Sequence, residues 1–139
     1  MVGAAAGWFP SPQPGDIVWC RFPEERLPKP GPKARPALVL QVGEDQGRPV
    51  VVVAYGTSQK VDRLYPGEFV IAPSDLEAYD VAGLSHPTKF DLRRTFELDY
   101  NDIWFAVAPG APCGQSPKLG LLHPSLVKRA RAAFNTARK

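Results

Sequence analysis

Short hydrophobic runs, separated by proline and glycine, dominate the first hundred residues of the chain. Residues 16–22 alternate between two faces, whereas residues 36–42 and 49–55 are hydrophobic at consecutive positions, which is typical of strands buried on both faces. Glycines and acidic residues at positions 43–47 suit a hairpin between the latter two runs. With a further short strand over residues 68–72, the pattern predicts a mainly β domain.

A longer strand is predicted over residues 88–98, where hydrophobic and polar side chains alternate almost throughout. The hydrophobic positions that share one face are Phe90, Leu92, Phe96 and Leu98. Arg94 interrupts the alternation by falling on this face. Two explanations stay open: a β-bulge or a snorkelling side chain at Arg94, or an arginine that leaves the core for a pocket or an interface.

The chain ends in a predicted helix. Residues 109–120 are rich in proline and glycine and predict an irregular connection, after which Pro124 suits the first turn of a helix. Hydrophobic residues then recur at three- and four-residue intervals, at Leu126, Val127, Ala130, Ala133, Phe134 and Ala137. Earlier in the chain, Ser74 is placed to cap a short helical turn over residues 75–81.

Length and composition limit the domain organisation. The chain has 139 residues, of which 44% are hydrophobic, enough for one core. We therefore predict a flexible N-terminal arm over residues 1–13 and a single domain over residues 14–139. The net charge of +3 favours an anionic partner, although the composition does not resemble that of a protein that coats nucleic acid.

The sequence also predicts a cytoplasmic location. No hydrophobic run reaches the roughly eighteen residues that a membrane span needs, and the N-terminus lacks the pattern of a signal peptide. Cys20 and Cys113 are accordingly expected to be reduced thiols. Neither cysteine has a second cysteine or a histidine at ligand spacing, so no metal ion is expected. The lack of a long hydrophobic run likewise predicts no membrane partner.

Polar side chains at the ends of two predicted strands carry the candidate chemistry. Arg35 stands just before the strand over residues 36–42, and Thr57 follows the strand over residues 49–55. A polar group at such a position needs a hydrogen-bond partner or has a functional role, and these two side chains could share one pocket. A guanidinium beside a hydroxyl suits recognition of a phosphate and stabilisation of an oxyanion at phosphorus, which points towards RNA.

The two histidines, His86 and His123, form a second candidate pair, for acid–base catalysis, because imidazole titrates near neutral pH. Each precedes a proline, which favours an extended loop position, and neither has an orienting carboxylate nearby in the sequence. The sequence therefore favours Arg35 and Thr57 over the histidines. No Gly-x-Ser-x-Gly elbow and no phosphate-binding glycine loop occurs, which argues against acyl transfer and nucleotide hydrolysis.

Four motifs follow one another along the chain: Gly15-Asp16 at a strand start, Arg35-Pro36-Ala37, Thr57-Ser58-Gln59 and Gly83-Leu84-Ser85. Their order resembles that of the MazF/PemK (Kid) family of toxin endoribonucleases from type II toxin–antitoxin systems, and the likeness spans residues 14–135. It implies an SH3-like, partly open β-barrel with a C-terminal helix, the fold of the MazF, PemK and CcdB toxins. It also implies a homodimer.

The resemblance further implies cleavage of single-stranded RNA without a metal or other cofactor. The ribose 2′-hydroxyl attacks the adjoining phosphate and leaves a 2′,3′-cyclic phosphate and a 5′-hydroxyl end, with Arg35 and Thr57 as the catalytic residues. The candidate RNA-binding residues are Lys29, Lys33, Ser58, Gln59, Lys60, Arg93 and Arg94. In the family, a cognate antitoxin inhibits the toxin by occupying the RNA groove with a flexible tail. A wider basic surface suits either an RNA backbone or an acidic antitoxin peptide and comprises Arg26, Lys29, Lys33, Lys60, Arg63, Lys89 and Arg93.

One position departs from the family pattern. Some members carry a carboxylate five residues before the arginine, where it can act as a base, but this chain has Pro30 there. Glu24, Glu25 and Asp16 are candidate replacements, and the sequence does not choose among them. The alternative function is therefore a non-catalytic SH3-like binding module, or an inactive toxin homologue that uses the groove only to hold a protein or nucleic-acid partner.

Overall fold

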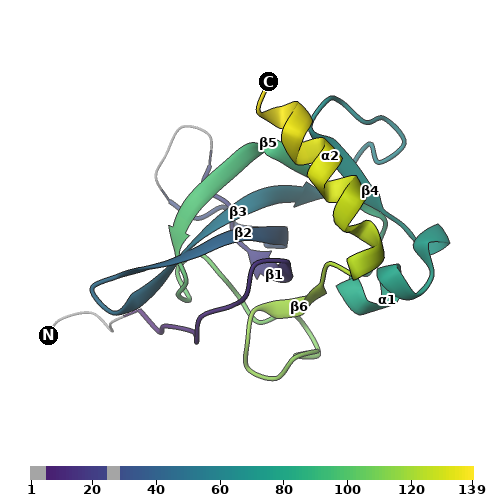
Figure 1. Ribbon diagram of the computed structural model, residues 1–139. Coiled ribbons are helices and arrows are strands. Elements are labelled where there is room, and N and C mark those ends of the chain that lie inside the picture. The colour runs from purple at the N-terminus through teal and green to yellow at the C-terminus, as the bar shows by residue number, and fades with distance from the viewer. Residues whose placement is uncertain (1–5, 25–28) are drawn as a thin grey trace, which may run out of the picture.

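Antiparallel strands form one six-stranded sheet in the computed structural model, which describes residues 6–24 and 29–139 (Figure 1). The strands are β1 (Asp16–Cys20), β2 (Arg35–Asp45), β3 (Arg48–Thr57), β4 (Glu68–Ile71), β5 (Thr88–Asp99) and β6 (Lys118–Leu121). They lie in the order β4-β5-β3-β2-β1-β6. Among the described residues, β4 and β6 are therefore the outer strands, and the sheet does not close into a barrel. The predicted mainly β, partly open architecture with a C-terminal helix is confirmed.

The helical segments lie on one side of the sheet (Figure 1). They are η1 (Pro73–Asp75), α1 (Glu77–Ala82), η2 (Pro124–Leu126) and α2 (Val127–Ala137). The predicted cap at Ser74 is wrong: Ser74 lies inside η1, and the Asp75 carboxylate instead accepts a hydrogen bond from the Ala72 N–H at 2.9 Å. Within the described ranges, no helix has the length and hydrophobicity needed to cross a bilayer.

Hydrophobic residues fill both faces of the sheet, as the consecutive hydrophobic runs predict. The helix-side cluster joins the sheet to α1 and α2 and contains Ile17, Leu38, Ala54, Phe69, Ile71, Ala78, Ala82, Leu84, Phe90, Leu92, Leu119, Leu126, Ala130 and Ala133. The second cluster contains Val18, Cys20, Phe22, Ala37, Val39, Val51, Val53, Leu98, Tyr100 and Phe105. Burial raises the pKa of the Cys20 thiol, which therefore stays protonated, while Cys113 is a free, exposed thiol.

A bulge in β5 corrects the prediction for that strand. Asp91 pairs with Tyr55 of β3, and Thr95 pairs with the adjacent Ala54, so residues 92–94 lie between two successive pairs. Because three is an odd number, the alternation reverses across the bulge. The side chains of Phe90 and Leu92 join the helix-side cluster, whereas those of Phe96 and Leu98 pack in the second cluster. The predicted common face is therefore wrong, and the bulge at Arg94 is confirmed.

Strand β6 was not predicted and begins inside the predicted irregular connection over residues 109–120. It pairs with β1 through Lys118, Gly120 and Leu121, with Gly120 opposite Ile17. A Cβ on Gly120 would lie only 2.4 Å from the carbonyl carbon of Ala82, so glycine is needed where β6 passes under α1. The segment contains a glycine and follows a run rich in proline and glycine, so the sequence pattern indicated an irregular connection there instead of a strand.

Part of the predicted N-terminal arm packs against the sheet. Trp8 forms an antiparallel bridge with Asn101, and the Phe9 N–H donates to the carbonyl oxygen of Tyr100 at 3.1 Å. The Phe9 and Tyr100 rings also meet edge to face, with centroids 5.8 Å apart. These contacts attach the chain before β1 to the end of β5. The arm prediction for residues 1–5 lies outside the described residues.

A buried ion pair holds β4 against β5. The Lys89 Nζ donates to Glu68 Oε1 at 3.0 Å and to the Arg63 carbonyl oxygen at 2.9 Å. The Lys89 and Glu68 side chains are only 7% and 9% exposed, and Glu68 Oε1 also accepts from the Tyr65 N–H at 2.7 Å. The prediction that Lys89 belongs to a basic surface is therefore wrong. Lys89 instead ties the loop after β3 to the sheet.

The Lys89→Met substitution should lower the free energy of unfolding by about 3–5 kcal/mol in a urea titration, because it leaves the Glu68 carboxylate buried without its cation. Lys60→Met, at an exposed position in the same loop, should change the value by less than about 0.5 kcal/mol. If both variants match the wild type, the buried pair does not hold β4 in place.

Candidate functional site

Strands β2 and β3 bring Arg35 and Thr57 to the same end of the sheet. The strands are antiparallel, and Ala37 lies opposite Tyr55. Arg35 lies two residues before Ala37 and Thr57 lies two residues after Tyr55, so the strand alternation places all four on one face. Both Arg35 and Thr57 line a pocket with a volume of about 520 Å³. The structure thus brings the two sequence-predicted catalytic residues together.

Loops from distant parts of the sequence complete this pocket. Lys33 and Ser58 flank Arg35 and Thr57 along the chain, while Ser85 and His86 come from the loop between α1 and β5. The other residues of the lining are Trp19, Ala34, Pro36, Gly83, Leu84, Thr88, Ala108, Pro109, Pro112 and Leu119. Basic and hydroxyl groups therefore converge within a largely hydrophobic frame, a common composition for a ligand site.

The Thr57 hydroxyl is oriented by the backbone that follows it. Its Oγ1 accepts a hydrogen bond from the Gln59 N–H at 3.1 Å. A hydroxyl has one donor and two acceptor positions, so this bond leaves the hydrogen of the hydroxyl to donate to a ligand. The side chain is half-buried at the pocket wall. Thr57 can therefore present an oriented donor to an anion.

The ring of Tyr55 supports two guanidinium groups. The Cζ atom of Arg94 lies 4.1 Å from the ring centroid, and that of Arg35 lies 6.0 Å from it. Tyr55 is held in turn by Phe22, with ring centroids 4.9 Å apart. The bulge in β5 therefore carries Arg94 into the neighbourhood of Arg35, and two positive charges gather beside the pocket.

The predicted RNA-binding residues divide according to their distance from this pocket. Lys33 and Ser58 line it directly, and Arg94 approaches it through Tyr55. Lys33, Ser58 and Arg94 are all exposed. Together with Arg35 and Thr57, these three residues form a set of positively charged and hydroxyl side chains, and none of the five carries a carboxylate.

The other predicted RNA-binding residues lie outside the pocket lining. Gln59 and Lys60 are exposed in the turn that follows β3, and Lys29 is exposed in the chain before β2. Arg93 points elsewhere: its Cγ lies 2.7 Å from the position that a Cβ on Gly67 would take. Arg93 therefore packs beside the loop that enters β4, whereas its neighbour in the bulge, Arg94, lies over the Tyr55 ring.

The carboxylates that the sequence offered as bases are absent from the described lining of the pocket. Asp16 is buried, pairs with the Lys118 ammonium at 3.3 Å and accepts a backbone N–H at 2.9 Å, so it has a structural role. Glu24 is exposed and does not line the pocket. The predictions for Glu25 and Arg26 fall outside the described residues.

The two histidines have different surroundings. His86 lines the pocket with Arg35 and Thr57. His123 is engaged elsewhere, with Nδ1 at 2.8 Å from the Ser125 Oγ and Nε2 at 3.7 Å from a carboxylate oxygen of Glu77. In the sequence, neither histidine has an orienting carboxylate nearby, so the placement of His86 in this pocket was not predicted. The available signal was the Gly-Leu-Ser segment that directly precedes His86.

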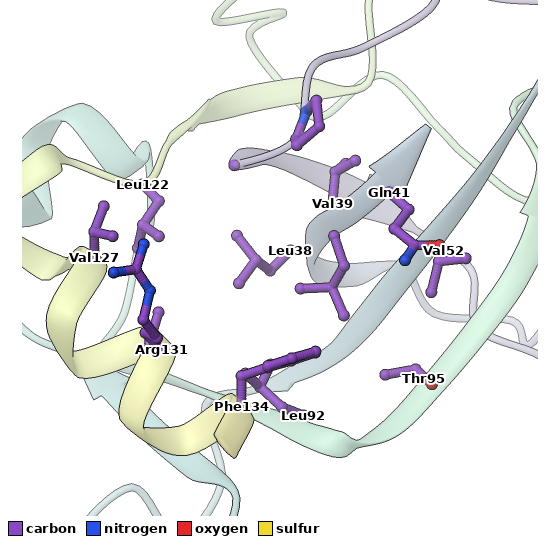
Figure 2. A pocket seen from close by; sticks show the side chains of 14 residues that line it. Leu38, Val39, Gln41, Val52, Leu92, Thr95, Leu122, Val127, Arg131 and Phe134 are labelled. Carbon is purple, nitrogen blue, oxygen red and sulfur yellow. The ribbon is translucent and has the colours of Figure 1, made fainter. Parts of the chain in front are cut away.

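A second pocket, of about 560 Å³, lies between α2 and the sheet (Figure 2). Its lining is mainly hydrophobic, and Leu38, Leu92 and Phe134 lie around the cavity in Figure 2. Arg131 and Thr95 stand on opposite sides of this cavity, so the guanidinium does not lie beside the hydroxyl. This cavity thus lacks the adjacent guanidinium and hydroxyl that the sequence predicts for a phosphate site, whereas the pocket of Arg35 and Thr57 has both groups in its lining.

The fold and the site together define a small, mainly β protein with a pocket suited to a phosphate group. A comparison with known protein families matches residues 13–111, well over half of the chain, to the PemK-like, MazF-like toxins of type II toxin–antitoxin systems. The chain belongs to this family. The matched region contains Arg35, Thr57 and His86 and ends before β6 and α2. No curated protein matched the chain in a separate sequence comparison.

The pocket depends on a close approach of β2 and β3 at Gly56, and the Gly56→Ala substitution tests it. A Cβ on Gly56 would lie 2.2 Å from the Pro36 carbonyl oxygen and 2.8 Å from a ring carbon of Phe90. Such overpacking should lower the free energy of unfolding by about 1–3 kcal/mol, measured by urea denaturation.

The matched control for this variant is Gly43→Ala, also within β2 and β3. There the nearest atom to an added Cβ would be the Val50 carbonyl oxygen, at an ordinary contact distance of 3.9 Å. The Gly43→Ala variant should stay within about 1 kcal/mol of the wild type. Equal stability of Gly56→Ala and Gly43→Ala would contradict the close approach of the strands.

Proposed function

We propose that this chain is an endoribonuclease that cleaves single-stranded RNA without a metal ion. The proposal rests on the placement of Arg35 and Thr57 in one pocket of a chain from a toxin family. In the reaction, the ribose 2′-oxygen loses its proton and bonds to the adjoining phosphorus. The bond from phosphorus to the 5′-oxygen breaks, and that oxygen gains a proton. The products carry a 2′,3′-cyclic phosphate and a 5′-hydroxyl.

Arg35 stabilises the charge that develops on the non-bridging oxygens of the phosphate. A guanidinium stays protonated in proteins, so Arg35 serves as a permanent positive charge and not as a base. Its half-buried position strengthens the interaction, because a charge at the edge of the protein is screened less than one in open water. Donors fixed before the reaction are an effective means of stabilising such a transition state.

Thr57 orients the same phosphate. Its oxygen already accepts the Gln59 N–H, so its hydrogen is directed to another acceptor, for which a phosphate oxygen is suitable. Lys33, Ser58 and Arg94 then extend the contact along the RNA backbone. A single strand suits this site, because the flexible backbone can bring the 2′-oxygen, phosphorus and 5′-oxygen into line.

The partners follow from the family and the charge of the site. We propose that a cognate antitoxin inhibits the enzyme by laying an acidic segment over the basic groups at the pocket, which competes with RNA for the same charges. We further propose that the toxin acts in the cytoplasm as a homodimer and needs no cofactor. Sequence preference depends on the loops around the pocket.

A second candidate function is a binding module that holds RNA or protein without cleaving it. The observation that favours it is the missing carboxylate: Pro30 stands where some relatives carry a base, and Asp16 is committed to the Lys118 ion pair. Incubation of the wild-type protein with mixed RNA distinguishes the two functions, because only an enzyme produces fragments with new ends.

The Arg35→Ala variant should cleave RNA at least about a hundredfold more slowly than the wild type, because it loses the charge on the transition-state phosphate. Thr57→Ala should lose less, about tenfold, since it removes one neutral hydrogen bond. Single-turnover rates on a defined RNA measure both effects. Arg138→Ala is the matched control, because Arg138 also lies over an aromatic ring, 5.4 Å from the Phe134 centroid, but outside this pocket. Wild-type rates in Arg35→Ala would contradict its assignment.

Cleavage should persist in excess EDTA at a rate within about twofold of that without it, because Arg35 supplies the positive charge that a metal ion provides in other nucleases. Mass spectrometry of the fragments should find 2′,3′-cyclic phosphate ends. A substrate with one 2′-deoxy sugar at the cut site should remain intact, as it lacks the nucleophile. Activity that disappears in EDTA and returns with magnesium would assign the protein to a different class of nuclease.

A further inference from the structure

We propose that His86 is the general base of this site and takes the proton from the attacking 2′-hydroxyl. The inference rests on the proposed ribonuclease function and fills the one role that the sequence left unassigned. It comes from the lining of the pocket, in which His86 stands with Arg35 and Thr57, although it is 51 and 29 positions away from them in the chain (86 − 35 and 86 − 57).

The loop that carries His86 is fixed at both ends. At its start, Gly83 has a left-handed φ of 70°, and a Cβ there would lie 2.0 Å from the Leu119 carbonyl oxygen, so the loop is held tightly against β6. At its end, the buried Thr88 donates its hydroxyl to the His86 carbonyl oxygen at 2.9 Å. Pro87 restricts the backbone of His86 to an extended conformation. The imidazole is therefore presented from an ordered backbone.

The chemistry of the described lining singles out His86. The charged side chains that share the pocket with it are Lys33, from the chain before β2, and Arg35, at the start of β2. A guanidinium does not give up its proton, and a lysine ammonium ordinarily does so only in strongly basic solution. Hydroxyl groups such as that of Ser85 are poor bases. Imidazole is the side-chain type in this lining that exchanges a proton near neutral pH.

The surroundings of the two histidines explain why the role falls on one of them. The His86 side chain is exposed, and the described residues give its ring no hydrogen-bond partner, so both ring nitrogens are accessible to a substrate. His123 already contacts Ser125 and Glu77 through its two nitrogens. Both histidines precede a proline and have a serine within two positions. His123 is thus a control of matched sequence context outside the pocket.

A ring nitrogen of neutral His86 accepts the proton of the 2′-hydroxyl while the 2′-oxygen bonds to phosphorus. The bond between phosphorus and the 5′-oxygen breaks, and solvent water supplies a proton to that oxygen. Arg35 stabilises the negative charge on the non-bridging oxygens throughout. His86 afterwards returns its proton to solvent, and the enzyme is ready for another cycle.

The test compares His86→Gln with His123→Gln on one defined RNA. Glutamine keeps a polar side chain of similar size but does not titrate, so the fold should be retained, which circular dichroism checks. His86→Gln should reduce the single-turnover rate by about a hundredfold or more, while its affinity for an uncleavable 2′-deoxy substrate stays within about twofold of the wild-type value. His123→Gln should cleave at the wild-type rate.

The dependence on pH gives a readout that a merely structural role would not change. The wild-type rate should rise with pH and then level off, because only a base without its proton can accept one from the 2′-hydroxyl. The residual rate of His86→Gln should lack this rise. A His86→Gln variant with the wild-type profile would contradict the assignment even if its rate were lower.

A substrate in which sulfur replaces the bridging 5′-oxygen separates a base from an acid. A thiolate leaves without being protonated, so loss of a general acid would do no harm on this substrate, whereas loss of a general base would still slow the attack. The defect of His86→Gln should therefore persist on the sulfur substrate. If the defect disappeared on this substrate, the role of His86 as a base would be overturned.

An active wild type with a fully active His86→Gln would overturn this inference alone, and a wild type that cleaves no RNA would overturn the proposed function with it.

Discussion

The close antiparallel pairing of β2 with β3 is the constraint on which the rest of the structure depends. It places Arg35 and Thr57 at one end of the sheet, on the same face as Ala37 and Tyr55. Gly56 makes this possible, because any side chain there would meet the backbone of β2. The site therefore rests on main-chain hydrogen bonds, which are rigid, and its loops are added to a fixed frame.

The bulge in β5 adds a further charged side chain to the site at the end of β2 and β3. An uninterrupted strand would place Arg94 on the face of Phe96 and Leu98 or force it into the core. Residues 92–94 lie between two successive pairs and reverse the alternation. The hydrophobic side chains before the bulge therefore pack in the helix-side cluster, and those after it pack in the second cluster. Arg94 becomes exposed and stacks on Tyr55. A feature that disrupts the ladder thus brings a third cation to the site, after Lys33 and Arg35.

The charged residues of this protein fall into two groups, which differ in exposure and in whether a partner of opposite charge is present. Lys89 and Asp16 are buried and have partners of opposite charge, Glu68 and Lys118, so they contribute to the fold. The cations at the pocket stand in a lining without carboxylates among its described residues. An anion that enters meets positive charge, and the part of the lining that the structure describes holds no carboxylate to neutralise it, which suits both an RNA phosphate and an acidic inhibitor.

The sequence by itself determined the mainly β architecture, the main strands and the C-terminal helix, because hydrophobic patterns are local signals. Its polar residues at strand ends also determined the family and the placement of Arg35 and Thr57 in one pocket. Only the tertiary structure decided which charges are buried, where β5 reverses its faces, that β6 exists and that His86 reaches the pocket. These features depend on contacts between segments far apart in the chain. A strand that begins inside a run rich in proline and glycine gives a pattern typical of a loop. A lysine in an alternating strand gives the same pattern whether it faces solvent or a buried glutamate.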